Sequence, residues 1–95
     1  MVKEFPFKER LISDGTTQTV FRIFKESVDP DELMWHWDEE DRIVHVIRES
    51  DWLFQFDNLL PQSLTGVLKI PKGTWHRVIK GNGDLSIIIE KMSDI

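Results

Sequence analysis

The sequence predicts an all-β protein, either a sandwich or a closed barrel of antiparallel strands. Short runs of β-branched and aromatic residues recur along its 95 residues, and turn signals containing Gly or Pro separate these runs. No stretch keeps a convincing helical period. A chain of this length forms one domain, so we expect a single domain over residues 1–95. Within it, we expect residues 1–18 to be an arm or strand that covers a sheet face or reaches a partner subunit.

Seven strands are expected, most of them next to a turn signal. Asp14-Gly15 precedes the first of them, and Pro71-Lys72-Gly73 and Gly81-Asn82-Gly83-Asp84 precede the last two. Residues 26–33 have room for one helical turn, because Asp29-Pro30 disfavours a longer helix. The acidic stretch at 38–41 is expected to be a solvated turn. The strands are expected at residues 19–24, 32–37, 42–48, 51–57, 66–70, 75–80 and 85–91.

Charge and composition exclude several classes of partner. The chain has 12 basic and 17 acidic residues, and the basic ones are scattered, which disfavours binding to nucleic acid. No apolar run approaches the roughly 18–20 residues of a membrane span, and the charged N-terminal stretch does not fit a signal peptide. Without cysteine there is no disulfide, thiol nucleophile or thiolate metal site. No phosphate loop stands out, so we expect no nucleotide cofactor, and a cytoplasmic location is the default expectation.

Two of the expected strands are apolar on both faces. In residues 42–48, Val44 and Val46 lie on one face and Ile43 and Ile47 on the other, and residues 85–91 repeat this pattern. A half-solvated antiparallel strand has one polar face. We therefore expect a second layer over this sheet, supplied by the partner subunit of a homodimer. The alternative is that the N-terminal segment folds over the face within one chain.

Three side chains from distant parts of the chain form a candidate metal site. His36 and Asp38 are two residues apart, so they project from the same face of a strand. His76 joins them if its strand lies alongside. Two imidazoles and a carboxylate with open positions suit non-heme Fe(II) and other divalent metals. A buried structural role for His36, between two tryptophans, and a solvated position for Asp38 are the alternatives.

The segment from Gly66 to His76, Gly-Val-Leu-Lys-Ile-Pro-Lys-Gly-Thr-Trp-His, resembles the second motif of the cupin family. It has one residue fewer than usual between Gly66 and Pro71. Residues 35–49 resemble the first motif, in which His-x-His precedes a Glu and a turn glycine. With the segment between them, the motifs extend over residues 35–89. The resemblance implies a small antiparallel cupin-type β-barrel, or double-stranded jelly roll, with a site in the barrel mouth.

The resemblance also implies a divalent metal, Fe, Mn, Zn or Ni, held by His36, Asp38 and His76. Asp38 stands where the second histidine of the first motif belongs, and Glu49 replaces the turn glycine. Arg42 stands about where the family has a metal-binding Glu, and a guanidinium cannot coordinate a cation. If Arg42 points inward, it suits a carboxylate or phosphate of a ligand. If it points outward, it pairs with the acidic loop.

Two function classes follow from this resemblance. One is a metal-dependent cupin enzyme, of the oxygenase, isomerase or decarboxylase type, that acts on a small molecule. The other is a metal-free cupin that binds a small anionic or carbohydrate ligand without catalysis. In either class Arg42, Trp52, Phe54 and Phe56 are candidate ligand contacts, and the three aromatic residues are alternatively core.

Overall fold

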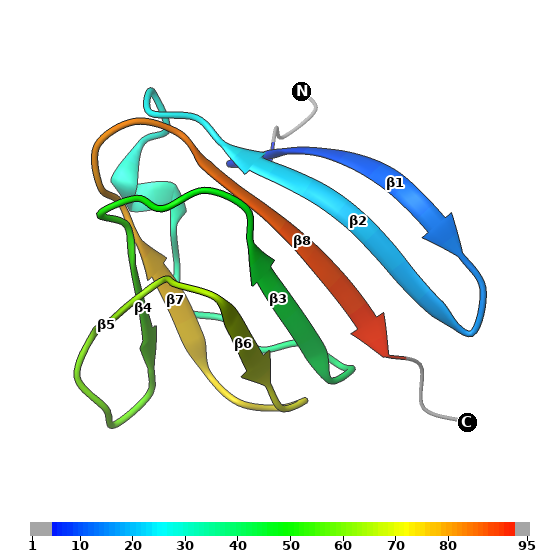
Figure 1. The fold of residues 1–95 in the computed structure, drawn as a ribbon. Helices are drawn as coiled ribbons and strands as arrows, with labels where there is room; N and C mark the ends of the chain where they lie inside the picture. The colour runs from blue at the N-terminus through cyan, green and yellow to red at the C-terminus, as the bar shows by residue number, and fades with distance from the viewer. Residues whose placement is uncertain (1–4, 93–95) are drawn as a thin grey trace, which may run out of the picture.

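Two antiparallel sheets face each other in the computed structural model, which describes residues 5–92 (Figure 1). The larger sheet has the strand order β1-β2-β8-β3-β6, and the smaller has the order β5-β4-β7. The larger sheet consists of β1 (Lys8–Asp14), β2 (Thr17–Phe24), β8 (Leu85–Met92), β3 (Arg42–Val46) and β6 (Val67–Ile70). The smaller consists of β5 (Gln62–Ser63), β4 (Leu53–Phe56) and β7 (His76–Ile79), and one 3₁₀ turn, η1, spans Pro30–Glu32.

This arrangement confirms the all-β jelly-roll prediction and corrects some of its elements. The strand expected at residues 32–37 is wrong, because His36 makes an isolated β-bridge and its neighbours form no strand. The helical turn expected within residues 26–33 is present as η1, whose first residue is Pro30. Strand β5 was not expected, since two residues carry too little alternation to be recognised.

The core lies between the sheets and follows the alternation of the strands. Val20 and Phe24 of β2 face it, as do Leu85, Ile87 and Ile89 of β8. Antiparallel strands alternate their side chains between two faces, so these residues share the interior face. Within residues 5–92, the other buried apolar residues are Val28, Val44, Trp52, Phe54, Leu64 and Ile70.

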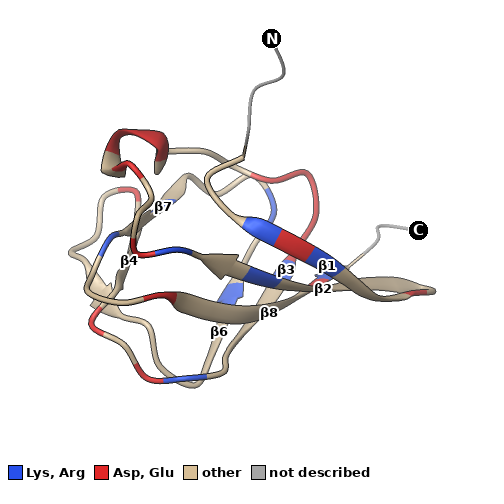
Figure 2. Ribbon diagram, turned by 90° about the horizontal axis from the view of Figure 1, so that it is seen from above, with Lys and Arg blue, Asp and Glu red and all other residues tan. Residues whose placement is uncertain are grey.

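Strand β1 extends the larger sheet at its edge, and Phe7 just before it packs against Phe24 on the interior side of that sheet. Strand β1 pairs antiparallel with β2, with an irregularity between Leu11 and Ser13, and every residue of β1 is exposed. Figure 2 shows β1 at the edge of the sheet, with basic, acidic and basic positions following one another at its start. The outer face of this sheet carries partly exposed apolar side chains, including Ile43 and Ile88. The homodimer expected from this face stays a prediction.

Within residues 5–92, no helix is long and apolar enough to span a membrane.

The loop between β7 and β8 is clamped to the start of β4. Asp51 accepts hydrogen bonds from the backbone N–H of Asn82 at 2.6 Å and from its side-chain amide at 2.8 Å. The indole N–H of Trp52, which is fully buried, donates to the carbonyl of Gly83 at 3.0 Å. Gly83 has a φ of +71°, a conformation that glycine adopts without steric cost.

Candidate metal centre

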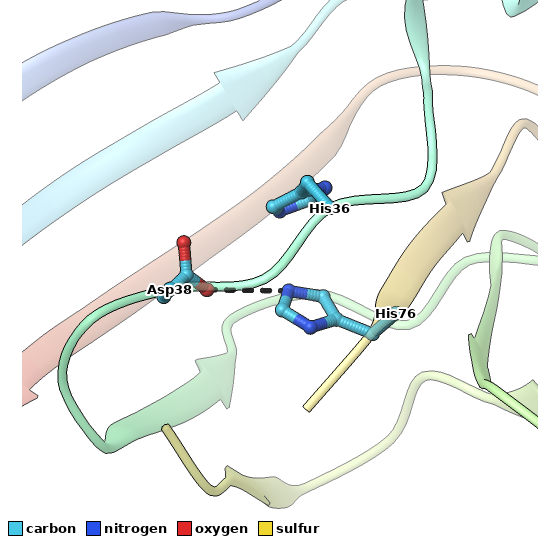
Figure 3. A group of neighbouring side chains, drawn as sticks. All are labelled: His36, Asp38 and His76. Atoms are coloured by element: carbon cyan, nitrogen blue, oxygen red, sulfur yellow. Dashed lines mark ion pairs between the residues drawn. The ribbon is translucent and has the colours of Figure 1, made fainter. Parts of the chain in front are cut away.

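The two histidines of the sequence motifs lie side by side. The backbone N–H of His36 donates to the carbonyl of His76 at 3.0 Å, and the reverse bond measures 2.9 Å. Residues that exchange both hydrogen bonds across an antiparallel bridge project their side chains to the same side. The two rings accordingly meet with centroids 4.3 Å apart (Figure 3).

Each imidazole is oriented by the chain just before it. His36 Nδ1 lies 3.0 Å from the carbonyl oxygen of Met34, and His76 Nδ1 lies 2.8 Å from that of Thr74. A carbonyl only accepts, so Nδ1 carries the proton in both rings. In the neutral ring Nε2 then holds the free lone pair, which is the arrangement usual for a metal-bound histidine with an oriented second nitrogen.

Asp38 completes a group of three ligand atoms that lie within 4.8 Å of one another. Its Oδ2 lies 3.3 Å from His76 Nε2, but the orientation does not make a hydrogen bond. Among the described residues, Asp38 Oδ2 is a buried polar atom that receives no hydrogen bond. Such atoms are rare and often mark an ion or a water. Atoms bound to one metal at about 2.1 Å lie at most about 4.2 Å apart, so a small contraction would bring all three into coordination.

The protonation states favour metal ligation. Burial lowers the pKa of His36, so its imidazole is neutral at pH 7. Burial alone would raise the pKa of Asp38, but its contact with His76 and the charge of Arg42 lower it below the usual value. A neutral imidazole and a carboxylate are the forms that bind a cation. The donors therefore fit a divalent metal, with the remaining positions open to a ligand.

Arg42 points into the interior and is neutralised by two carboxylates. Its Nη2 lies 3.3 Å from Asp38 Oδ1 and 2.8 Å from Glu40 Oε1, and Nε donates to the same Glu40 oxygen at 2.9 Å. The expectation of a solvated acidic turn at 38–41 is thus wrong for Asp38 and Glu40. Asp38 and Glu40 turn inward toward Arg42, and Asp41 accepts a hydrogen bond from Lys72 N at 2.8 Å.

The turn of the second motif also contacts the site. The backbone N–H of Gly73 donates to the carbonyl of Asp38 at 2.9 Å, and Gly73 has a φ of +74°. A residue with a side chain is strained in this conformation, which explains the glycine of the Pro-x-Gly turn. The turn thereby holds the loop that carries Asp38 against the start of β7.

Two cavities adjoin the histidines. The inner one, about 50 Å³, lies between the sheets and is lined by His36, His76 and Arg42 together with apolar core residues. The outer one, about 230 Å³, is lined by His36, Arg22 and apolar residues that include Phe7 and Met34. His36 belongs to both, and it is exposed through the outer cavity.

Phe54 and Phe56 of β4, and Trp52 just before this strand, lie in different surroundings. Phe54 lines the inner cavity and stacks on the His76 ring at 5.4 Å between centroids. Trp52 is fully buried against Phe24 and lines neither cavity. Phe56 packs edge-on against Phe54 and also lies outside both linings. The structure therefore brings Arg42 and Phe54 next to the metal candidates, and it places Trp52 and Phe56 behind them in the packing.

Sequence reasoning missed Arg22 and its partner Glu9. Arg22 lies between Val20 and Phe24 on the interior face of β2, so a charge on an otherwise apolar alternation was the available signal. Glu9 meets it because the two residues are paired across β1 and β2. Strand β1 is charged and exposed, and its register was not readable from the sequence.

Comparison with solved structures decides what this arrangement is. A cupin domain from Bordetella pertussis Tohama I matches with a TM-score of 0.70 at 16% identity, covering 99% of this chain and 100% of that one. The chain has a cupin-type fold. No protein-family model matches the sequence, and no curated protein matches it significantly.

Larger proteins share the fold over part of their length. The DMSP lyase DddQ from Ruegeria pomeroyi DSS-3 matches with a TM-score of 0.77 at 12% identity, covering 95% of this chain and 48% of that one. HppE, whose structures contain Co(II) or Fe(II), matches the cupin fold of this chain with a TM-score of 0.70 in both forms. For the cobalt form the identity is 10%, with 97% of this chain and 56% of that chain covered. At these identities the likeness concerns the fold.

Proposed function

We propose that this chain is a metal-binding cupin in which His36, Asp38 and His76 hold one divalent cation. The single observation that carries the proposal is the buried Asp38 Oδ2, which receives no hydrogen bond in the described part of the chain and faces a histidine Nε2. Burying a carboxylate oxygen without a partner is costly, and a cation bound between the three donors removes that cost.

The cation would serve a small molecule in the adjoining cavities. Two imidazoles and one carboxylate would leave coordination positions open on the cation, and His36 lines both adjoining cavities. A divalent cation held by His36, Asp38 and His76 would supply Lewis-acid chemistry. HppE, whose structures contain Co(II) or Fe(II), and the DMSP lyase DddQ share the fold, which supports a catalytic use of the site.

Metal analysis of purified variants tests the proposal. Wild-type protein is supplied separately with Fe(II), Mn(II), Zn(II) or Ni(II), desalted and analysed for bound metal, and about one ion per chain is expected for at least one of them. His36→Ala and Asp38→Asn should each lose most of that metal. His45→Ala is the matched control, because His45 pairs with Glu90 at 2.8 Å on the outer face of the large sheet. Equal metal in wild type and His36→Ala would contradict the proposal.

A metal-free ligand-binding cupin is the second candidate. Arg42 favours it, because its guanidinium already lies 3.3 Å from Asp38 Oδ1 and partly neutralises the carboxylate. On this alternative, no variant of the three residues changes the metal content, whereas ligand affinity still depends on the cavity. The same metal analysis therefore separates the two functions.

A further inference from the structure

Arg22 is a buried cation on the interior face of β2. It is 9% exposed, and neighbouring interior positions on the strand are the apolar Val20 and Phe24. A guanidinium cannot lose its charge in a protein, so its presence in this layer requires anionic partners. Burial lowers the pKa of Arg22, and Glu9 opposes that shift.

Arg22 faces the same space as the metal candidates. It lines both the inner cavity of about 50 Å³ and the outer cavity of about 230 Å³, and His36 lines both with it. The charges of Arg42 and Asp38 also act on its guanidinium. The rest of the outer lining is mostly apolar, and Glu32 is its solvent-exposed acidic member.

The guanidinium of Arg22 has N–H donors that its bond to Glu9 does not use. Its Nε and Nη2 donate to one oxygen, Glu9 Oε1, at 3.1 and 2.7 Å, and Nη1 donates to no other described residue. Phe7 covers its face, with Cζ 3.7 Å from the ring centroid, and holds the plane of the fork. Arg42 differs, because it has two carboxylates as partners. Of the two interior arginines, Arg22 is therefore the one that can accept a further anion.

We propose that Arg22 binds the carboxylate of a small ligand whose apolar body fills the outer cavity. The planar fork of a guanidinium matches a carboxylate, and the aromatic and aliphatic lining suits an aryl or branched alkyl group. This inference names the ligand class of the proposed function and rests on it for the role of the pocket. With a divalent cation bound, Asp38, Glu40 and Arg42 would leave a net positive charge, which an anionic ligand neutralises.

Glu9 competes with the ligand for Arg22. It lies on the exposed edge strand β1, and its side chain is 28% exposed, so it can move into solvent when another carboxylate binds. Removing its charge should therefore strengthen ligand binding, whereas removing the charge of Arg22 should weaken it. A purely structural ion pair predicts no effect of either change on ligand affinity.

Titration with benzoate, followed by two-dimensional ¹H–¹⁵N NMR, tests the proposal in metal-loaded and metal-free protein. Benzamide is the neutral probe of the same shape. We expect benzoate to shift the Arg22 Nε–H resonance and to bind more tightly than benzamide. Arg22→Gln should weaken benzoate binding at least about tenfold, because the charge-assisted hydrogen bonds between the guanidinium and the carboxylate are lost. Arg22→Lys should bind with intermediate affinity, and Glu9→Gln more tightly than wild type.

Arg10→Gln is the matched control, since it removes the same charge from the other face of β1. The spectrum of each variant shows directly whether it is folded. If Arg22→Gln does not fold, Glu9→Gln still tests the proposal, because Glu9 is partly exposed and its replacement should be tolerated. Equal affinity of wild type and Arg22→Gln, or of benzoate and benzamide, would overturn the inference while a metal at His36, Asp38 and His76 still stood. If wild-type protein binds no divalent metal but still binds benzoate in a manner that depends on Arg22, the proposed metal site is rejected and the inference about Arg22 stands.

Discussion

His36 and His76 form a two-way backbone bridge, with N–H to carbonyl distances of 3.0 and 2.9 Å. The bridge joins a loop to the first residue of β7, so residues forty positions apart present their rings to one place. A slip of one residue in this pairing would turn one ring to the opposite face. The precision of the candidate metal centre thus depends on backbone pairing more than on side-chain contacts between the ligands.

Replacing Arg42 should strengthen metal binding. Arg42→Gln removes a positive charge that lies 3.3 Å from Asp38 Oδ1, and a like charge beside a cation site weakens it. We expect the dissociation constant of the preferred divalent metal to fall about tenfold, or about 1.4 kcal/mol, in calorimetric titrations. The melting temperature should fall at the same time, because Asp38 and Glu40 lose their cationic partner.

The control for this prediction is Arg77→Gln. Arg77 donates to Gln55 Oε1 at 2.9 and 2.8 Å and lies over the Trp35 ring. Arg77→Gln therefore removes one positive charge, as Arg42→Gln does, from a side chain that contacts Gln55 and Trp35 and none of the three candidate ligands. We expect unchanged metal affinity in this variant. If both variants tighten metal binding equally, the effect comes from net charge and not from the position of Arg42.

Gly81→Ala should destabilise the protein through the clamp beside Trp52. A Cβ atom at Gly81 would lie 2.6 Å from Trp52 N and 2.7 Å from the carbonyl carbon of Asp51, which are backbone atoms that cannot easily move aside. Overpacking of this kind costs about 1–3 kcal/mol. Gly15→Ala is the control, since a Cβ there meets no atom within 4 Å. Denaturant unfolding of both variants measures the difference, and equal stabilities would contradict the account of the clamp.

The fold was predictable wherever one strand face is buried. Strand β2 alternates between buried and half-buried positions, and β8 does the same, so the period of two was visible in the sequence. Strand β1 lacks this signal, because all its residues are exposed and its extended form depends on pairing with β2. The bulky residues at 33–37 mimic a strand, but only His36 pairs with another segment.

The proximity of the three candidate side chains was predictable from the sequence, but the electrostatics around them was not. The resemblance of two motifs was enough to bring His36, Asp38 and His76 together. The orientation of Arg42 depended on whether the acidic loop turns inward, which is a property of the folded chain. Arg22 and Glu9 meet through the register of β1 and β2, and no local pattern encodes that register.

Acid should weaken the clamp at the loop between β7 and β8. The backbone N–H and side-chain amide of Asn82 lower the pKa of Asp51 below its ordinary value of 3.8. Since the folded pKa is the lower one, the carboxylate contributes stability that is fully present above pH 3.8 and is lost as the pH falls through the folded value. Asp51→Asn should therefore lower the melting temperature most at pH 7 and progressively less below pH 3.8.

Melting curves of wild type and Asp51→Asn between pH 7 and pH 2.5 measure this convergence. Asp14→Asn serves as the control for a general change in charge, because the Asp14 side chain makes no hydrogen bond to another described residue and lies at the exposed end of β1. Convergence of the two curves at low pH identifies the ionised Asp51 as the stabilising form. A difference in melting temperature that stays constant across the range would contradict the prediction, because the effect of the substitution would then not depend on the ionisation of Asp51.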